Sequence, residues 1–312
     1  MSLNSEAGGH VVGIDIGGTN LRLCLADANG KLAHKWAAAI PRASPPEAVI
    51  DQVRKGVDES LAATGIARSS LCAVAAGAPG LTNVDTGMVI ATSYLLGWKD
   101  VPLRDLLESG LGVPASVEND VKMAAIGESR FGAGSGVRNF VFLAIGTGIG
   151  AGIFLNGEVL HGEGWSAGEV GYLIVPGTAE APADFGEPGQ LENVIGGEGI
   201  RAQWRAISQE NLQATEIFDR ASRGDPLAAG VLNRSALLLA YAIRNIAVIL
   251  NCSLFVLGGT VGLSKPFCDA TQRILDERNE RIRPRLTRST LGADAQLMGA
   301  VALALNHRKT GV

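Results

Sequence analysis

A strand–turn–strand pattern occurs twice in this chain, and the repetition limits the folds that the chain can adopt. The first copy, VVGIDIGGTNLRLCL at residues 11–25, has apolar runs on both sides of a glycine pair, and an Asn-Gly turn follows. The second copy, FVFLAIGTGIGAGIFLNGEVL at 140–160, repeats the order of apolar runs and turns. Each copy predicts three strands joined by tight turns. Because the copies begin about 130 residues apart, the repeat has the size of a domain and excludes a solenoid.

The glycine turns are candidate binding loops for an anion. Gly17 and Gly18 permit a tight turn with positive φ and leave no Cβ in the way of a ligand. Such a turn can aim backbone N–H groups at a phosphate, although a single copy is more typical of a plain hairpin. The pattern Gly146-x-Gly148-x-x-Ala151 also fits a dinucleotide fingerprint. That fingerprint requires a helix directly after the glycines, and here another strand follows.

A third glycine turn, Gly258-Gly259-Thr260, follows a short apolar strand at 253–257. The two repeated hairpins and this turn resemble the phosphate-1, phosphate-2 and adenosine motifs of the actin/hexokinase-like ATPases. Within that superfamily the chain most resembles the ROK family of repressors, uncharacterised reading frames and sugar kinases. The motifs that carry the resemblance are DIGGTN, GAPG, VENDVKMAAIGE, IGTGIGAG, AGEVGY and LGGT.

The resemblance runs from about residue 11 to residue 305 and implies an α/β fold. Two similar domains, each a mixed sheet with helices, would be separated by a cleft. The expected N-terminal domain covers residues 1–118 and about 295–312, and the larger C-terminal domain covers 119–294. A length of 312 residues with 46% hydrophobic residues suits two globular domains.

Charge and cysteine content narrow the class of protein further. The net charge of −4 and the lack of a basic block argue against a nucleic-acid partner. The start of the chain lacks the basic and apolar parts of a signal peptide, and the apolar helical stretch at 236–250 is expected to be too short to span a membrane. Scattered thiols predict a cytoplasmic protein with reduced cysteines, namely Cys24, Cys72, Cys252 and Cys268.

The resemblance implies that ATP and Mg²⁺ are the cofactors. Phosphates would lie on the first two glycine turns and adenosine near the third. The implied ATP-binding residues are Asp15, Gly17, Gly18, Thr19, Asn20, Gly146, Thr147, Gly148, Gly258, Gly259 and Thr260. Asp15 is also the expected metal ligand, because a carboxylate just before a phosphate turn can hold Mg²⁺ directly or through water.

The segment 115–131 contains the candidate catalytic residue. A short strand ends near Val117, and Asn119 or Asp120 is expected to cap the helix that follows. Taken alone, Asp120 is most simply an N-cap. The resemblance matches Asp120 to the catalytic base and Asn119 to a residue that bonds sugar hydroxyls. A helix N-terminus keeps such a carboxylate ionised, and phosphoryl transfer depends mainly on positioning.

The remaining sugar contacts also follow from the resemblance. The GAPG turn, with Gly77, Pro79 and Gly80, would lie beside the sugar, and Glu169, Tyr172 and Glu192 would contact it. From the residues alone, GAPG can be an ordinary turn, Glu192 a surface residue and Tyr172 a packing residue. Trp98 is expected to pack. The family usually has Pro-Asn-Leu where this chain has Ser93-Tyr94-Leu95, which leaves the identity of the sugar open.

The chain departs from the family most clearly at its zinc site. The family binds a structural zinc through one His and three Cys, and all four positions differ here: Tyr172, Ala183, Phe185 and Gln190. We expect no zinc, with apolar packing by Phe185 in its place. The hydroxyl of Tyr172 would make the sugar contact of the family's His, or Tyr172 would merely pack.

The implied function is ATP-dependent phosphorylation of a hexose, with glucose at the 6-hydroxyl as the leading expectation. The alternatives are a kinase for fructose, mannose or an N-acyl-hexosamine, and a non-catalytic sugar-sensing protein. Repressors of the family carry an N-terminal DNA-binding segment, for which the residues before Val11 leave no room, and Asp120 and both glycine turns favour the enzyme. We expect a homodimer with a sugar and ATP as partners, and no nucleic acid or membrane.

Overall fold

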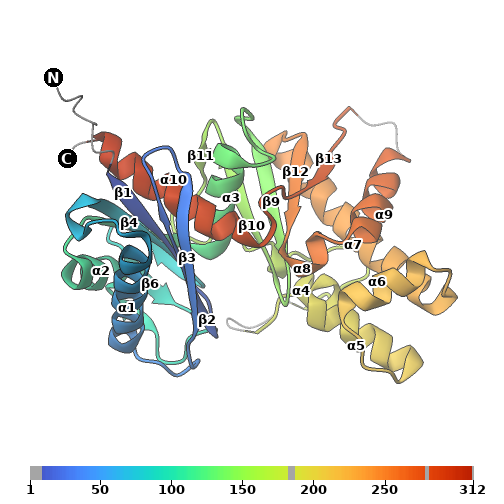
Figure 1. Cartoon of the computed structure of the whole chain (residues 1–312). Helices are drawn as coiled ribbons and strands as arrows, with labels where there is room; N and C mark the ends of the chain where they lie inside the picture. Colours follow the sequence, from blue (N-terminus) through green and yellow to red (C-terminus); the bar gives the residue numbers. More distant parts are fainter. Residues whose placement is uncertain (1–8, 182–186, 278–280, 311–312) are drawn as a thin grey trace. The chain divides into compact units, whose positions relative to one another are not determined.

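The structure is a computed structural model, and it describes residues 9–181, 187–277 and 281–310 (Figure 1). Contacts divide the chain into two compact units. The first is Met1–Arg130 with Asp294–Val312, and the second is Phe131–Ala293. These units differ from the expected domains, 1–118 with about 295–312 and 119–294, mainly in the helix that begins at Asp120.

The first unit is built on a five-stranded mixed sheet. Strands β1 and β2 are antiparallel, as are β2 and β3, whereas β4 is parallel to both β1 and β8. The sheet order is β3-β2-β1-β4-β8, with bounds β1 (His10–Ile16), β2 (Asn20–Ala26), β3 (Leu32–Ala39), β4 (Leu71–Ala78) and β8 (Ala115–Asn119). A small antiparallel sheet follows β4 in the chain, with β5 (Leu81–Asn83), β6 (Met88–Ala91) and β7 (Lys99–Val101).

Helices cover both faces of this sheet. Successive residues of a strand point to opposite faces. Ile14 of β1 lies in a buried cluster with Val53 of α1, whereas a Cβ at the next position, Gly13, would meet the backbone of α10 at Leu297. The helices of the unit are α1 (Pro46–Thr64), α2 (Leu103–Leu111), α3 (Asp120–Phe131) and α10 (Ala295–Thr310).

Two glycines hold α3 directly against α10. A Cβ on Gly127 would collide with the carbonyl oxygen of Ala295, and a Cβ on Gly299 would collide with that of Met123. The two helices therefore meet backbone to backbone. This contact fixes α3, and with it Asp120 at its first turn, to the first unit.

The second unit repeats the sheet of the first. Its order is β11-β10-β9-β12-β13, with β10 antiparallel to β9 and β11, and β12 parallel to β9 and β13. The strands are β9 (Phe140–Ile145), β10 (Ile149–Leu155), β11 (Glu158–Val159), β12 (Leu254–Gly258) and β13 (Arg285–Arg288). When the strands of each five-stranded sheet are numbered in chain order, both sheets have the order 3-2-1-4-5. The predicted duplication and the two mixed sheets are confirmed.

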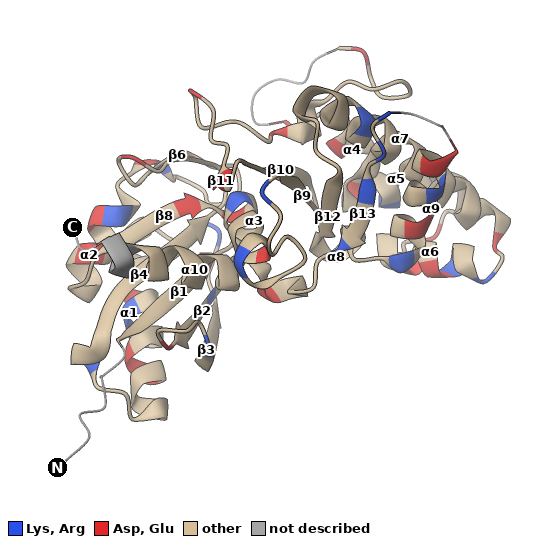
Figure 2. Cartoon of the chain, turned by 90° about the horizontal axis from the view of Figure 1, so that it is seen from above, with Lys and Arg blue, Asp and Glu red and all other residues tan. Residues whose placement is uncertain are grey.

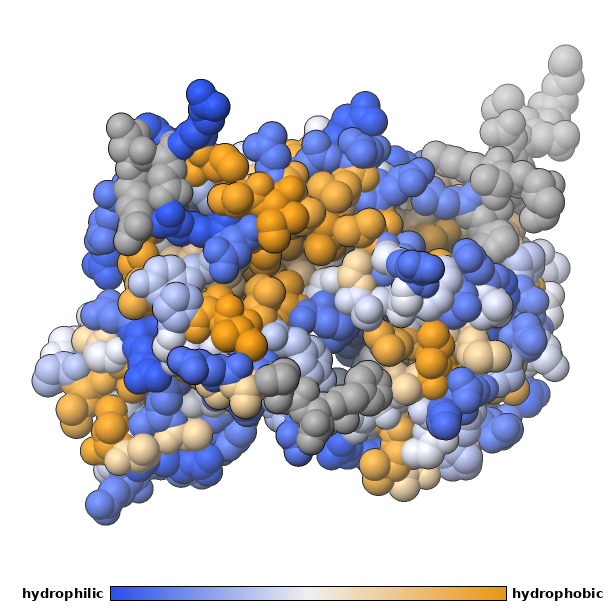
Figure 3. All heavy atoms as spheres, turned by 180° about the vertical axis from the view of Figure 1, so that it is seen from behind, coloured by the Kyte–Doolittle hydropathy of each residue, from blue (hydrophilic) through white to orange (hydrophobic). Residues whose placement is uncertain are grey.

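The second unit carries more helices than the first. They are α4 (Glu192–Ile195), α5 (Gly197–Ser208), α6 (Ala214–Ser222), α7 (Pro226–Leu250), α8 (Gly259–Gly262) and α9 (Lys265–Asp276). Lys and Arg lie among Asp and Glu along α6 and α9 (Figure 2). The face drawn in Figure 3 shows exposed apolar side chains between polar ones.

Helix α7 corrects one expectation. Within the described part of the chain it alone is long and apolar enough to cross a membrane by length and composition, so the prediction of too short a stretch is wrong about its length. The helix is longer because Asp225 caps it and Pro226 begins it, well before the apolar stretch at 236–250. Of its most apolar stretch, 56% is buried inside the protein, and the helix packs on α6 and α9 as a core helix does.

Candidate active site

The first glycine turn (residues 17–20) is tight, but not for the reason expected from its sequence. The amide of Gly17 donates to the carbonyl oxygen of Asn20 at 2.8 Å, which closes the turn. Neither Gly17 nor Gly18 has the predicted positive φ. The glycines are required by close approach instead, because a Cβ on Gly18 would lie 3.1 Å from the carbonyl oxygen of Tyr94. Thr19 and Asn20 are exposed at the tip.

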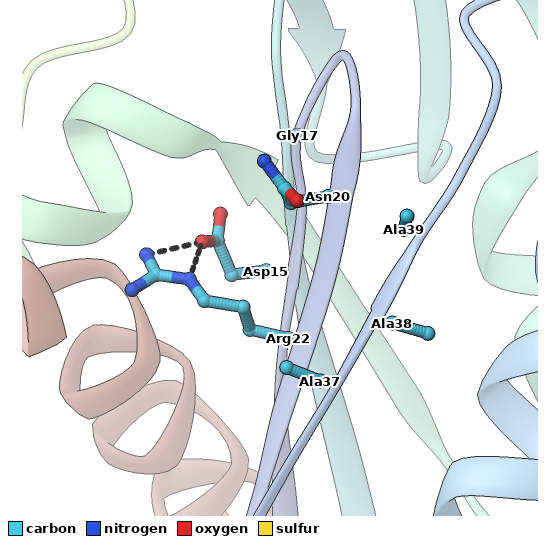
Figure 4. Close-up of a pocket in the computed structure, with 7 residues that line it drawn as sticks. All are labelled: Asp15, Gly17, Asn20, Arg22, Ala37, Ala38 and Ala39. Atoms are coloured by element: carbon cyan, nitrogen blue, oxygen red, sulfur yellow. Dashed lines mark hydrogen bonds and ion pairs between the residues drawn. The ribbon is translucent and has the colours of Figure 1, made fainter.

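A hollow of about 550 Å³ lies beside this turn. It is lined by Asp15, Gly17, Asn20, Arg22, Ala37, Ala38 and Ala39 (Figure 4). Ala37, Ala38 and Ala39 are the last three residues of β3. Asp15, the residue expected to approach a metal and the phosphates, thus lies in a cavity next to the glycine turn.

Asp15 forms an ion pair that the sequence analysis did not assign. Arg22 donates to Oδ2 of Asp15 from Nε at 2.9 Å and from Nη2 at 2.5 Å (Figure 4). The two residues face each other across β1 and β2. The register of a hairpin around residues 17–20 could have indicated this pair.

Burial raises the pKa of the Asp15 carboxyl above its ordinary value, and the charge and hydrogen bonds of Arg22 oppose that rise. Both bonds from Arg22 go to Oδ2, so Oδ1 is left without a partner among the described residues. A carboxylate that lines a cavity and has one oxygen left over fits Mg²⁺, which keeps several waters and takes further oxygens from phosphates.

Asn119 and Asp120 lie at the end of β8 and the start of α3. Oδ1 of Asn119 accepts from the amides of Val121 and Lys122, both at 3.0 Å, so Asn119 is the helix cap. Asp120 is half-buried in the first turn, and its Oδ1 accepts from the amide of Val121 at 2.8 Å. The position at a helix N-terminus stabilises the ionised form of this carboxylate.

The GAPG turn, residues 77–80, contacts both Asn119 and Asp120. Asn119 donates from Nδ2 to the carbonyl oxygen of Gly80 at 2.9 Å, and Gly80 has a φ of +98°. A Cβ on Gly77 would lie 3.6 Å from Cα of Asp120, and Pro79 is buried. The structure therefore brings the predicted sugar-binding residues Gly77, Pro79, Gly80, Asn119 and Asp120 together in the first unit.

The second glycine turn (residues 146–148) links β9 to β10. The amide of Gly146 donates to the carbonyl oxygen of Gly148 at 2.9 Å, and Thr147 is exposed at the tip. A Cβ on Gly146 would meet nothing within 4 Å, so the space in front of this residue is open. Open space beside a glycine turn is what a phosphate needs.

The third glycine turn (residues 258–260) packs against the same strand as the second. Gly259 has a φ of +75°, and a Cβ there would collide with the carbonyl oxygen of Ile145, one residue before the second turn. A Cβ on Gly258 would collide with Phe142, and Thr260 is exposed. The second unit therefore holds both of its predicted nucleotide turns at the end of β9.

The other predicted sugar residues also belong to the second unit. Glu169 is exposed, directly before the single helical turn Val170–Tyr172. Tyr172 is 38% exposed, and its hydroxyl donates to the carbonyl oxygen of Glu187 at 3.0 Å. Glu192 begins α4 and is half-buried, and its Oε2 accepts from the amide of Ile149 at 2.9 Å. The bond from Ile149 was not foreseen, because nothing in the sequence links the two positions.

The residues at the family's zinc positions do not fit a zinc ion. Gln190 is buried, and its Nε2 donates to the carbonyl oxygen of Ala181 at 2.5 Å. Ala183 and Phe185 lie outside the described residues, so the expected packing by Phe185 stays a prediction. The described residues contain no group of three or more His, Cys, Asp or Glu that could hold a metal ion. Trp98, by contrast, packs as predicted, with 2% of its surface exposed.

Comparison with known proteins gives one family and several related kinases. A model of the ROK family matches residues 11–307. A glucokinase from Halalkalibacterium halodurans is 32% identical over 312 aligned positions, which cover 92% of each chain. An N-acetylmannosamine kinase from Salmonella typhi is 29% identical, over 93% of this chain and 97% of its own.

Two solved structures share the fold over nearly the full length. The ROK hexokinase from Thermus thermophilus has a TM-score of 0.80 and 28% identity, over 97% of this chain and 100% of its own. A ROK family glucokinase from Streptomyces griseus, in complex with glucose and AMPPNP, has a TM-score of 0.78 and 25% identity, over 96% of this chain and 100% of its own.

Proposed function

This chain belongs to the ROK family and is an ATP-dependent sugar kinase, and we propose that it transfers the γ-phosphoryl group of ATP to the 6-hydroxyl of glucose. The observation that carries the proposal is the position of Asp120 in a chain related to a glucokinase over most of its length. Asp120 is the first residue of α3 and lies beside the GAPG turn, and Asn119 caps the N-terminus of this helix. A positioned carboxylate of this kind can accept the proton of the attacking hydroxyl.

The proposal gives the remaining residues distinct roles. The sugar-binding residues of the proposal are Gly77, Pro79, Gly80, Asn119, Glu169, Tyr172 and Glu192. The ATP phosphates bind at the glycine turns, and the space in front of Gly146 is open for them. The adenosine lies near Gly258, Gly259 and Thr260.

Mg²⁺ is the second cofactor of the proposal. Asp15 would hold the ion through Oδ1, directly or through water, while Arg22 keeps Oδ2 in place. Bound Mg²⁺ neutralises charge on the transferring phosphoryl group. The chain itself contributes an oriented carboxylate, an open cavity beside the first glycine turn and the base Asp120.

A different hexose is the alternative that the chain supports best. The relatives include an N-acetylmannosamine kinase as well as a glucokinase. The segment Ser93-Tyr94-Leu95, which departs from the family pattern, packs over the first glycine turn through Tyr94. A changed residue at this place favours a changed sugar preference, and fructose, mannose and N-acyl-hexosamines are the candidates.

An assay of ADP release with ATP, Mg²⁺ and a panel of hexoses tests the proposed function. Glucose should give the highest kcat/KM, and omission of the sugar should reduce ADP release to background. A higher kcat/KM for N-acetylmannosamine or fructose would reassign the substrate. No sugar-dependent ADP release from folded protein would indicate a non-catalytic sugar-sensing protein. Cytoplasmic location and a homodimer stay predictions, which cell fractionation and sedimentation can check.

A further inference from the structure

The second glycine turn is attached to the start of helices α4 and α5 by contacts on both of its sides. Before the turn tip, the carbonyl oxygen of Gly146 accepts from the amide of Gly197 at 2.8 Å. After the turn, the amide of Ile149 donates to Oε2 of Glu192 at 2.9 Å. One bond therefore comes from the backbone, and the other from a single side chain.

The junction between α4 and α5 leaves no room for the turn to move toward it. A Cβ on Gly196 would lie 2.9 Å from the carbonyl oxygen of Thr147, and the amide of Gly196 donates to the carbonyl oxygen of Glu192 at 2.9 Å. The turn, the junction and the Glu192 carboxylate are thus packed as one assembly within the second unit.

The carboxylate of Glu192 still has an unused oxygen. Oε2 bonds the amide of Ile149, whereas Oε1 has no hydrogen-bond partner within the described part of the chain. Glu192 is half-buried, and a Cβ on Gly171 would lie 3.4 Å from Oε2, so the side chain is held close to the segment that carries Glu169 and Tyr172. A carboxylate has two oxygens and can accept hydrogen bonds from two sources at once.

We infer that Glu192 positions the second glycine turn for ATP and links that turn to the sugar. Resting on the proposed function, the inference adds that Oε2 holds the turn through Ile149 in the absence of sugar, while Oε1 accepts a sugar hydroxyl. A sugar that orders Glu192 also orders the turn. Bound sugar therefore raises the affinity for nucleotide, and bound nucleotide raises the affinity for sugar by the same factor.

The discriminating measurement is the affinity for a non-hydrolysable ATP analogue with Mg²⁺ and without sugar. A residue that only contacts sugar would leave this affinity unchanged. With Glu192→Gln, the charge-assisted bond to the Ile149 amide becomes a neutral one, and the affinity should fall by roughly tenfold. Glu198→Gln is the matched control, because Glu198 is an exposed carboxylate on α5 that pairs with Arg201 and Arg205. The control should bind the analogue as the wild type does.

Kinetics supply a second readout. Glu192→Gln should raise the KM for ATP together with the KM for glucose, and the gain in analogue affinity that glucose gives the wild type should shrink toward onefold. Unchanged analogue affinity and unchanged KM for ATP, with a raised KM for glucose, would overturn the inference and leave the proposed function standing. A wild type that releases no ADP with any sugar contradicts the proposed function instead.

A measurement on the wild type alone covers the case of a variant that does not fold. The amide resonance of Ile149 should shift when glucose is added without nucleotide, because glucose on Oε1 changes the acceptor on Oε2. The amide of Phe255 in the core of β12 serves as the reference, since it is fully buried away from the turn. Saturating glucose without a shift at Ile149 would overturn the inference.

Discussion

Asp120 is the proposed catalytic base, which accepts the proton of the attacking sugar hydroxyl. Asp120→Asn keeps a hydrogen-bonding group of the same size but removes the base, so turnover should fall by roughly two to four decades. Sugar affinity, measured by calorimetry, should change little. Asp105→Asn, an exposed aspartate in the first turn of α2, is the control that should retain full turnover. Near wild-type turnover of Asp120→Asn would refute the assignment of the base.

The cysteines give a second test at the scale of single residues. All four are free thiols, as the sequence analysis predicted, and Cys24, Cys252 and Cys268 are buried. Burial raises the pKa of Cys24 to about 12. At pH 8 only about one molecule in ten thousand therefore carries the reactive thiolate at Cys24.

Alkylation of the native protein at pH 8 should consequently modify Cys72 first and leave Cys24 untouched. Because the pKa of Cys24 lies above the working range, raising the pH toward 10 should increase its reactivity while the protein stays folded. Peptide mass mapping measures the extent of alkylation at Cys24 and at Cys72. Equal rates at Cys24 and Cys72 in folded protein would contradict the buried position of Cys24.

Residue roles were predictable where local sequence decides them and not where distant segments meet. A cap at Asn119 or Asp120 follows from the start of the helical pattern there, and the structure assigns the cap to Asn119. The positive φ expected at Gly17 and Gly18 was wrong, because the constraint comes from Tyr94 in a distant segment. The bond between Glu192 and Ile149 joins residues in different loops, and hydrophobic periodicity carries no signal for it.

At the scale of elements, the second glycine turn has room for a new side chain, whereas a Cβ on Gly259 in the third glycine turn would collide with the carbonyl oxygen of Ile145. Gly146→Val places its Cβ in open space, so the melting temperature should stay within a few degrees of the wild type. The branched side chain should nevertheless block a phosphate, and ATP affinity should fall by at least about tenfold. Calorimetry with the ATP analogue is the measurement, and normal affinity would remove residues 146–148 from the phosphate site.

The segment between Tyr172 and Gln190 is predicted to fold without zinc. In place of metal ligands, Tyr172 bonds the carbonyl oxygen of Glu187, and Gln190 bonds that of Ala181. These bonds join groups of the protein itself and need no ion. Elemental analysis of purified protein should find no stoichiometric zinc, and a zinc-selective chelator should leave melting temperature and Mg²⁺-supported activity unchanged. One tightly bound zinc per chain would disprove the prediction.

Helix and strand positions followed from the sequence wherever a pattern had its own boundary signals. Helix α7 has such signals at both ends, because Pro226 begins it and Asn251 ends it with a positive φ. The boundary between the two units was harder to foresee. Helix α3 belongs with the first unit because Gly127 and Gly299 let it touch α10, and α10 lies about 170 residues further along the chain.

At the scale of the whole molecule, the duplicated hairpins predicted that the chain contains two similar sheets. Two glycine turns, each between antiparallel strands, predicted two sheets of one kind, and both sheets have the same strand order. The parallel strands β4, β8, β12 and β13 were less predictable in their pairing. β4 pairs with β1 and β12 pairs with β9, whereas β8 and β13 pair with β4 and β12, and each of these strands follows a long crossover that carries no local signal for its partner.

The measurement that tests the central claim most directly is identification of the product by ³¹P NMR. Purified protein is incubated with ATP, Mg²⁺ and glucose, and the same mixture without glucose is the control. We predict equal amounts of ADP and glucose 6-phosphate, and neither product without glucose. A mixture in which ATP stays intact, or in which it yields only ADP and inorganic phosphate, would contradict the assignment of this chain as a glucose kinase.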